Sequence, residues 1–169
     1  VLRMALASTS ALEGGKTINH MATIPEGMPS VLVQERLMAN EDLTGAVPVP
    51  VEGTVLPDSY AYQKGETRAA ILKRMQDAMA TFLSEQWGKR GGDLAVKSPQ
   101  EAIILASIVE KETSVAAERP HVAGVYGNRL RMGMMLQADP TIIYPITKGK
   151  PLGRRIRKSE IATVNDYNT

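Results

Sequence analysis

The residues best suited to chemistry stand at the end of the longest apolar run in the chain, residues 102–109. Glu110, Lys111 and Glu112 follow that run directly. A carboxyl group in apolar surroundings has a raised pKa and stays protonated near neutral pH, which a general acid requires. The alternative is that these charges only mark the point at which a core helix reaches solvent. On this basis alone, Glu110 and Glu112 are equal candidates.

These charges must be positioned by a helix over Ser98–Thr113. Ser98 can cap the first turn, and Glu101 stands three residues later at the capping-box position. Because residues 102–109 are apolar on nearly every side, the pattern predicts a buried helix. At helical spacing Glu110 continues an apolar face of this helix, so we expect its carboxyl to lie in or beside apolar surroundings.

Four further polar residues stand in the apolar second half of the chain: Asn128, Gln137, Asp139 and Tyr144. Gln137 and Asp139 are two positions apart, so in an extended segment both would project from one face. Together with Glu110 they would surround an acid with hydrogen-bonding groups suited to a sugar. Each also has a structural alternative: a turn for the Asp-Pro pair, a core aromatic for the tyrosine, and a helix brace for the asparagine.

Composition excludes several kinds of chemistry. The chain has 169 residues, of which 43% are hydrophobic, enough for one domain with a sizeable core, with or without a small appendage. The absence of cysteine rules out disulfides, thiolate nucleophiles and cysteine-based zinc sites. The two histidines fit no metal-binding pattern, and no glycine-rich phosphate loop or nucleophile-elbow motif occurs. We expect no metal and no cofactor.

The charge balance gives no strong reason to expect nucleic acid as a partner. Lys and Arg total 20 against 18 Asp and Glu, for a net charge of +2. The basic run at residues 153–158 is better interpreted as a solvated loop that faces an anionic polymer or a membrane surface. No apolar run is long enough to span a bilayer.

The remaining patterns predict an α+β fold, with a small mixed sheet and a helical second half. Amphipathic spacing predicts a helix over residues 67–86, with Met75, Met79 and Phe82 in the core. The shorter elements are expected in this order: a strand and turn over 21–27, a helix over 30–40, a loop over 41–50, strand and turn over 50–65, a helix from Pro120 that Gly133 stops, a strand-like start to 134–145, and an exposed loop or short hairpin at the C-terminal end.

Five segments, read together and in order, closely resemble the YceG-like endolytic peptidoglycan transglycosylases. The resemblance extends from about residue 20 to the last residue, and the combination of the glutamate-rich helix end with the long LQADPT segment is its most specific part. The segments are TIPEG (23–27), EGTVLPDSY (52–60), ASIVEKET (106–113), VAGVYGNRLRMGMMLQADPTIIY (122–144) and YNT (167–169).

The resemblance implies a YceG-like catalytic domain over residues 21–169, preceded at 1–20 by the remnant of a LysM-like subdomain. It implies a bacterial inner-membrane protein with one N-terminal membrane helix, absent from this chain, and a catalytic domain in the periplasm. It also implies that the domain is truncated before a Gly-Leu-Pro-Pro-Gly-type segment of the family. The implied partners are peptidoglycan glycan strands and peptidoglycan synthases, with no nucleic acid.

The implied reaction cleaves the β-1,4 bond between N-acetylmuramic acid and N-acetylglucosamine in nascent strands and leaves a 1,6-anhydro end. The resemblance makes Glu110 the single general acid and base. One carboxyl can serve twice, because it protonates the leaving oxygen and then accepts the proton of the substrate's own 6-hydroxyl. The implied substrate-binding residues are Asn128, Gln137, Asp139, Thr141, Tyr144 and Asn168.

Three other functions stay open at this point. Ordinary glycosidases pair two carboxyl groups, so a hydrolytic muramidase would use Glu110 and Asp139. A glycan-binding or scaffold fragment would use the same surface without catalysis. A basic nucleic-acid-binding domain is the third.

Overall fold

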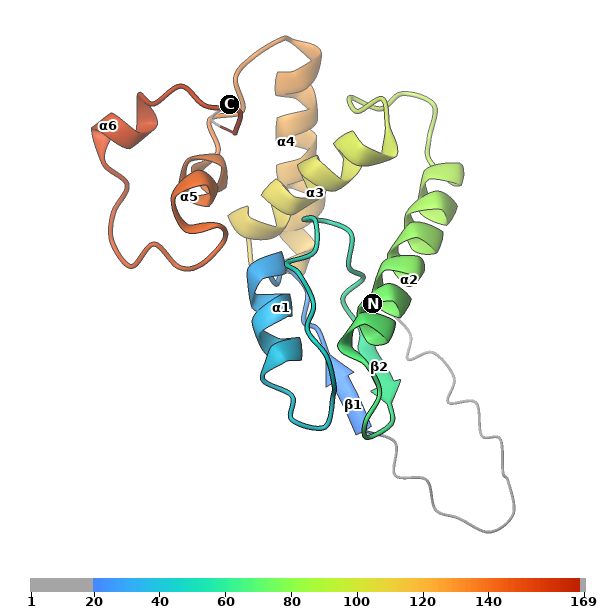
Figure 1. Cartoon of the computed structure of the whole chain (residues 1–169). Coiled ribbons are helices and arrows are strands. Elements are labelled where there is room, and N and C mark those ends of the chain that lie inside the picture. Colours follow the sequence, from blue (N-terminus) through green and yellow to red (C-terminus); the bar gives the residue numbers. More distant parts are fainter. Residues whose placement is uncertain (1–19, 168–169) are drawn as a thin grey trace.

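A small antiparallel sheet opens the part of the chain that the computed structural model describes, residues 20–167 (Figure 1). Strand β1 (His20–Thr23) pairs with strand β2 (Ser59–Tyr62), in a register that sets Ala22 opposite Tyr60. Ala22 and Tyr62 are the buried side chains of the two strands, so one face of the sheet packs on a core while the other stays exposed.

Helices make up most of the rest, so the fold is α+β as expected. Within residues 20–167 the structure has six α-helices, one short 3₁₀ helix and this two-stranded sheet (Figure 1). The helices are α1 (Ser30–Met38), α2 (Arg68–Gly88), α3 (Pro99–Glu112), the 3₁₀ helix η1 (Ala116–Glu118), α4 (Arg119–Arg131), α5 (Asp139–Thr147) and α6 (Lys158–Ile161).

The first hydrophobic core lies between the sheet, α1 and α2. Helix α2 contributes Ile71 and Met75 at four-residue spacing, both 0% exposed, which confirms the amphipathic helix expected from the sequence. Helix α1 contributes Val33 and Leu37, each 1% exposed. Full burial of side chains of this size stabilises the fold by about 1.5–3 kcal/mol each.

The second core lies between α3, α4 and the segment that leads into α5, and it corrects one prediction. The cap of α3 is as expected, since Ser98 Oγ accepts a hydrogen bond from the Glu101 N–H at 3.1 Å. The helix is not buried all round, however: only Ile108 and Val109 are buried, and Ile104 is 61% exposed. Neighbouring elements within residues 20–167 cover one side of α3, so an apolar sequence on every side does not produce burial on every side.

The strand-like start expected for residues 134–145 is also wrong. Residues 134–138 have no regular structure, and Asp139 begins helix α5. Gln137 has a φ of 55°, a left-handed conformation that breaks the two-residue alternation of a strand. Pro140 fits the first turn of a helix, where its missing N–H costs nothing. Gln137 and Asp139 therefore do not project from one extended face.

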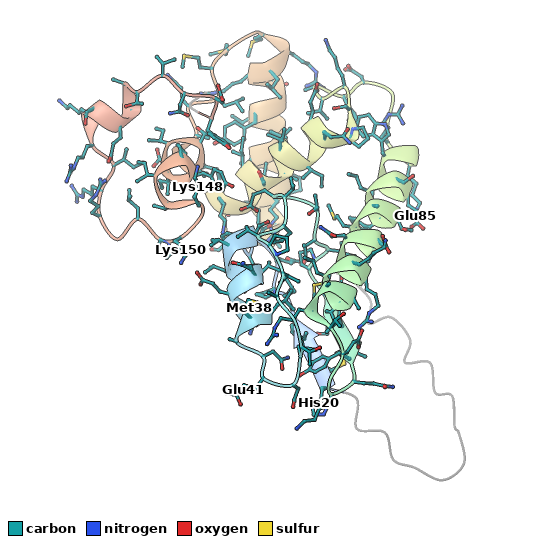
Figure 2. All side chains as sticks on the ribbon, in the orientation of Figure 1. His20, Met38, Glu41, Glu85, Lys148 and Lys150 are labelled. Carbon is teal, nitrogen blue, oxygen red and sulfur yellow. The ribbon has the colours of Figure 1, made fainter. Side chains whose placement is uncertain are left out.

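Beyond α5 the chain returns to α1 and then forms the short helix α6. Lys150 Nζ donates to Glu35 Oε1 of α1 at 2.6 Å, which places this segment beside α1 (Figure 2). No strand occurs in residues 148–167, so the tail is loop and helix rather than a hairpin. Among residues 20–167, no helix is both long and apolar enough to cross a membrane.

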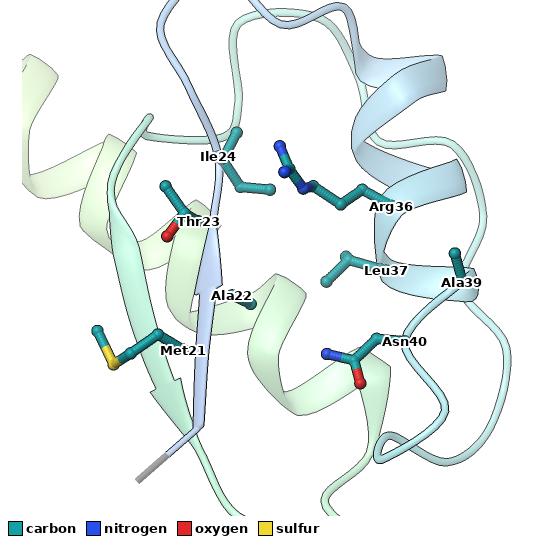
Figure 3. A pocket seen from close by; sticks show the side chains of 8 residues that line it. All are labelled: Met21, Ala22, Thr23, Ile24, Arg36, Leu37, Ala39 and Asn40. Atoms are coloured by element: carbon teal, nitrogen blue, oxygen red, sulfur yellow. The ribbon is translucent and has the colours of Figure 1, made fainter.

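A cavity of about 330 Å³ lies between β1 and α1. Figure 3 shows Ile24, the residue after β1, facing Arg36 and Leu37 of α1 across it. Its lining comes only from residues 21–24 and 36–40, so it is separate from Glu110 and from the other predicted site residues.

Candidate active site

Glu110 lies in the last turn of α3, where its carboxylate meets an arginine. Arg119, the first residue of α4, donates from Nη2 to Glu110 Oε1 at 3.0 Å. The same guanidinium places Nη1 at 3.6 Å from Oε2 of Glu26, in the turn after β1. The Glu110 side chain is 28% exposed. The prediction of an apolar environment for this carboxyl is therefore wrong, because the short link between α3 and α4 brings a cation to it.

The turn after β1 packs directly on Glu110. Gly27 has a φ of +67°, and a Cβ at this position would stand 3.0 Å from Glu110 Cγ. Lys111 Nζ donates to the Gly27 carbonyl at 2.7 Å. A side chain at position 27 would be strained and would press on the carboxyl-bearing chain, so glycine lets the turn approach this closely.

Glu52 holds the other end of the same turn. Its carboxylate accepts hydrogen bonds from the Ser30 N–H at 3.1 Å and from Ser30 Oγ at 3.0 Å, at the N-terminus of α1. Tyr144 Oη of α5 donates to Glu52 Oε1 at 3.3 Å. One carboxylate thus ties α1 to α5, a role that suits a negative charge at a helix N-terminus.

Tyr144 belongs to a small aromatic group on α5 and the chain after it. Its ring centroid lies 5.1 Å from that of Tyr167, with the planes inclined at 51°. Lys148 Nζ stands 5.6 Å from the Tyr144 ring and 5.7 Å from the Tyr167 ring. Burial, followed by the nearby Glu52 carboxylate, raises the pKa of Tyr144 to about 12. Its hydroxyl proton is donated to Glu52, so the hydroxyl oxygen and the ring are the parts of Tyr144 left to meet a ligand.

The remaining residues of the LQADPT segment lie around the start of α5. Gln137 and Asp139 are exposed, and Gln137 Oε1 is 3.4 Å from Arg129 Nη1. Arg129 also donates to the Leu136 carbonyl at 2.7 Å, which fixes the loop before α5. Thr141 is buried, and its hydroxyl donates to the Ala138 carbonyl at 2.7 Å.

Asn128 faces a different part of the molecule. Its Oδ1 accepts from Arg131 Nη1 at 3.1 Å, and Arg131 also donates to the Asp93 carbonyl at 3.2 Å. Nine residues along α4 place it about 13 Å from Arg119 along the axis and on the opposite side of the helix. The structure does not bring Asn128 to Glu110. Asn168 lies outside the described residues.

Glu112, the rival candidate, points elsewhere on α3 and has a partner of its own. Tyr126 of α4 is buried, and burial followed by its hydrogen bond to Glu112 raises the pKa of Tyr126 to about 12. Two residues along a helix turn the chain by about 200°, so Glu110 and Glu112 serve different sides. In the described part of the chain, no three acidic or histidine side chains gather closely enough to hold a metal ion.

Sequence reasoning did not single out Arg119, Glu26, Glu52 or Lys148. Glu26 and Glu52 belong to two of the segments that resemble the family, TIPEG and EGTVLPDSY, and that membership is the signal that could have identified them. Arg119 carries no such signal, since its place opposite Glu110 depends on how η1 redirects the chain.

Comparisons with known proteins agree on one family. The sequence matches the YceG-like family over residues 4–169. It is 29% identical to an endolytic murein transglycosylase of Bacillus subtilis (strain 168) over 71% of this chain and 32% of that protein. It is 32% identical to an endolytic murein transglycosylase of Streptococcus pneumoniae serotype 2 (strain D39) over 68% of this chain and 20% of that protein.

The fold has a solved counterpart. The crystal structure of a YceG-like protein from Listeria monocytogenes superposes with a TM-score of 0.64 at 19% identity, over 89% of this chain and 59% of that one. The chain therefore spans between about a fifth and a third of the curated relatives' length.

Proposed function

We propose, from the premise that the chain belongs to the YceG-like family, that it is the catalytic part of an endolytic transglycosylase acting on peptidoglycan. The relatives' names support the reaction class. The proposed bond is the β-1,4 link between N-acetylmuramic acid and N-acetylglucosamine in nascent glycan strands, and the proposed product carries a 1,6-anhydro muramic acid end.

The observation that carries this proposal is the position of Glu110. Its carboxylate is partly exposed at the end of α3, and it is held by Arg119 and by the turn at Gly27. A carboxyl that is both held and accessible suits a group that must meet substrate in a set orientation.

The proposed mechanism uses that carboxyl twice. Glu110 gives its proton to the glycosidic oxygen while the bond from that oxygen to the muramic acid C1 breaks. The 6-hydroxyl oxygen of the same muramic acid then bonds to C1, and its proton passes to Glu110. The acid is restored, no water is consumed, and no second carboxyl is needed to activate a nucleophile.

Substrate binding is proposed for the residues around α5. Tyr144 offers a ring and a hydroxyl oxygen, and its contacts with Tyr167 and Glu52 hold both in place. Gln137, Asp139 and Thr141 line the start of the same helix. Asn128 and Asn168 stay in the proposed set on the family resemblance alone.

Location and domain limits are proposals too. We propose that residues 21–169 form the catalytic domain, that residues 1–20 are the remnant of a LysM-like subdomain, and that the whole protein is held in the bacterial inner membrane with this domain outside the cytoplasm. Peptidoglycan synthases are the proposed protein partners. The support is the cell-wall substrate named for the relatives.

The reaction type is tested by digesting purified glycan strands in water enriched in heavy oxygen. Transglycosylation leaves the new ends unlabelled, since the 6-hydroxyl is the nucleophile. A hydrolytic muramidase would place the label on every new reducing end. Strands that bind without being cut would support the glycan-binding alternative.

A further inference from the structure

We infer that Arg119 is the positioning residue of Glu110, and that its guanidinium is shared between Glu110 and Glu26 so that it holds and releases the reacting carboxyl. The inference rests on the proposed function, and it adds two residues to it. Glu110 lies 3.0 Å from one terminal nitrogen of Arg119, and Glu26 lies 3.6 Å from the other.

The backbone fixes where Arg119 starts. Thr113 Oγ1 donates to Glu118 Oε2 at 2.7 Å and accepts from the Val115 N–H at 3.0 Å, which folds the link between α3 and α4 into η1. Arg119 follows as the first residue of α4. Its guanidinium is therefore aimed back at the end of α3 by local structure rather than by a long flexible loop.

The guanidinium itself is loosely engaged. Each carboxylate is met through one terminal nitrogen instead of the two-point contact that makes Arg–carboxylate pairs rigid. Arg119 Nε is buried and makes no hydrogen bond among the described residues. An unused buried donor means that this arrangement does not satisfy the arginine fully. The contact with Glu110 therefore rests on one hydrogen bond, which weakens when Glu110 loses its charge.

The proposed chemistry needs such a partner. Glu110 must be neutral before the first proton transfer and a carboxylate between the first and the second. A guanidinium contact stabilises the carboxylate that exists between the transfers. Glu26, whose side chain is 64% exposed, is a second carboxylate with which the guanidinium can pair when Glu110 is neutral.

The other charged groups near this end of α3 are occupied elsewhere. Lys111 donates to the Gly27 carbonyl, and Glu118 accepts from Thr113. On α5, Asp139 and Lys148 stand at opposite ends of the helix. Arg119, with Glu26 behind it, is thus the charged group that the structure records on Glu110.

The kinetic test compares Arg119→Met with Arg119→Lys on glycan strands. We expect Arg119→Met to lower kcat about tenfold or more with little change in KM, because it removes orientation rather than binding. Arg119→Lys should recover a large part of kcat, and Glu26→Gln should lower kcat in the same direction. Arg74→Met is the matched control, because Arg74 of α2 pairs with Glu66, just before that helix, and donates to the Ala61 carbonyl of β2. It has no recorded contact with Glu110 or Glu26, so this variant should leave kcat unchanged.

A second measurement needs no activity. In arginine-labelled protein, the NMR signal of the Arg119 Nε–H, assigned with Arg119→Lys, should be visible in the wild type because this group is buried. Glu110→Gln and Glu26→Gln should each shift it. If the Arg119 Nε–H signal does not shift in Glu26→Gln, Arg119 is not shared between the two carboxylates. If Arg119→Met has the wild-type kcat, Arg119 does not position Glu110. If the digestion in heavy-oxygen water gives reducing ends that carry the label, the proposed transglycosylase reaction is refuted. The NMR measurement then still decides whether Arg119 is shared between Glu110 and Glu26.

Discussion

Gly27 packs against Glu110 so closely that a methyl group at position 27 would stand 3.0 Å from Glu110 Cγ. Gly27→Ala should therefore displace Glu110, in addition to straining a residue with a φ of +67°. We expect kcat on glycan strands to fall about tenfold and the free energy of unfolding to fall by about 1–2 kcal/mol.

Gly45→Ala separates these two effects. Gly45 has a φ of +73° and nothing within 4 Å of an added Cβ. It should lose a similar free energy of unfolding while kcat stays at the wild-type value. Equal losses of kcat in the two variants would show that the contact with Glu110 is irrelevant.

Glu52→Gln should weaken the junction between α1 and α5. The glutamate carboxylate accepts from the Ser30 N–H, from Ser30 Oγ and from Tyr144 Oη, and an amide has one oxygen with which to replace it. We expect a loss of about 1 kcal/mol in urea denaturation. Glu35→Gln, which breaks only the exposed pair with Lys150, should cost less than that; a larger loss there would contradict the assignment.

Stability should fall at high pH because of buried tyrosines. Burial is the first cause that raises the pKa of Tyr126 from 10.0 to about 12, and Glu112 adds to it. A folded-state pKa above the unfolded value means that the stabilisation is fully present below pH 10 and is lost as pH rises through 12. Urea titrations at intervals across this window should show the drop. Tyr126→Phe should make it shallower, and an unchanged pH profile would argue against this cause.

The two faces of α3 should respond differently to substitution. Ile108 is 6% exposed and Ile104 is 61% exposed. Ile108→Ala should cost about 2–5 kcal/mol of unfolding free energy, while Ile104→Ser should stay within about 0.5 kcal/mol. A large loss of unfolding free energy in Ile104→Ser, measured by the same denaturation, would mean that Ile104 is buried, as the sequence predicted.

Local signals predicted helices α1 to α4, but not α5 or α6. Ser98 and Glu101 indicate the start of α3, and the four-residue spacing of Ile71 and Met75 predicts α2. These signals are reliable because they depend on hydrogen bonds and faces within a few residues of each other. The α+β class followed from them.

What failed depends on contacts between distant segments. The apolar run of α3 indicated burial on every side, but which sides of a helix are covered depends on other segments of the chain. Gln137 and Asp139 had a strand-like spacing, yet Arg129 holds the Leu136 carbonyl, and a helix begins at Asp139.

The environment of Glu110 was missed for the same reason. Its counter-ion, Arg119, is nine residues away in sequence and on another helix. Only the path through η1 brings the two together, and no periodicity in the sequence predicts that path.

The most direct test of the central claim is the mass of the products that Glu110→Gln and Glu112→Gln release from glycan strands. Anhydro ends are lighter than reducing ends by one water. We expect the wild type and Glu112→Gln to yield anhydro ends, and Glu110→Gln to lose activity by a factor of about 10² or more. Anhydro ends released by Glu110→Gln at the wild-type rate would contradict the role of Glu110 as acid and base.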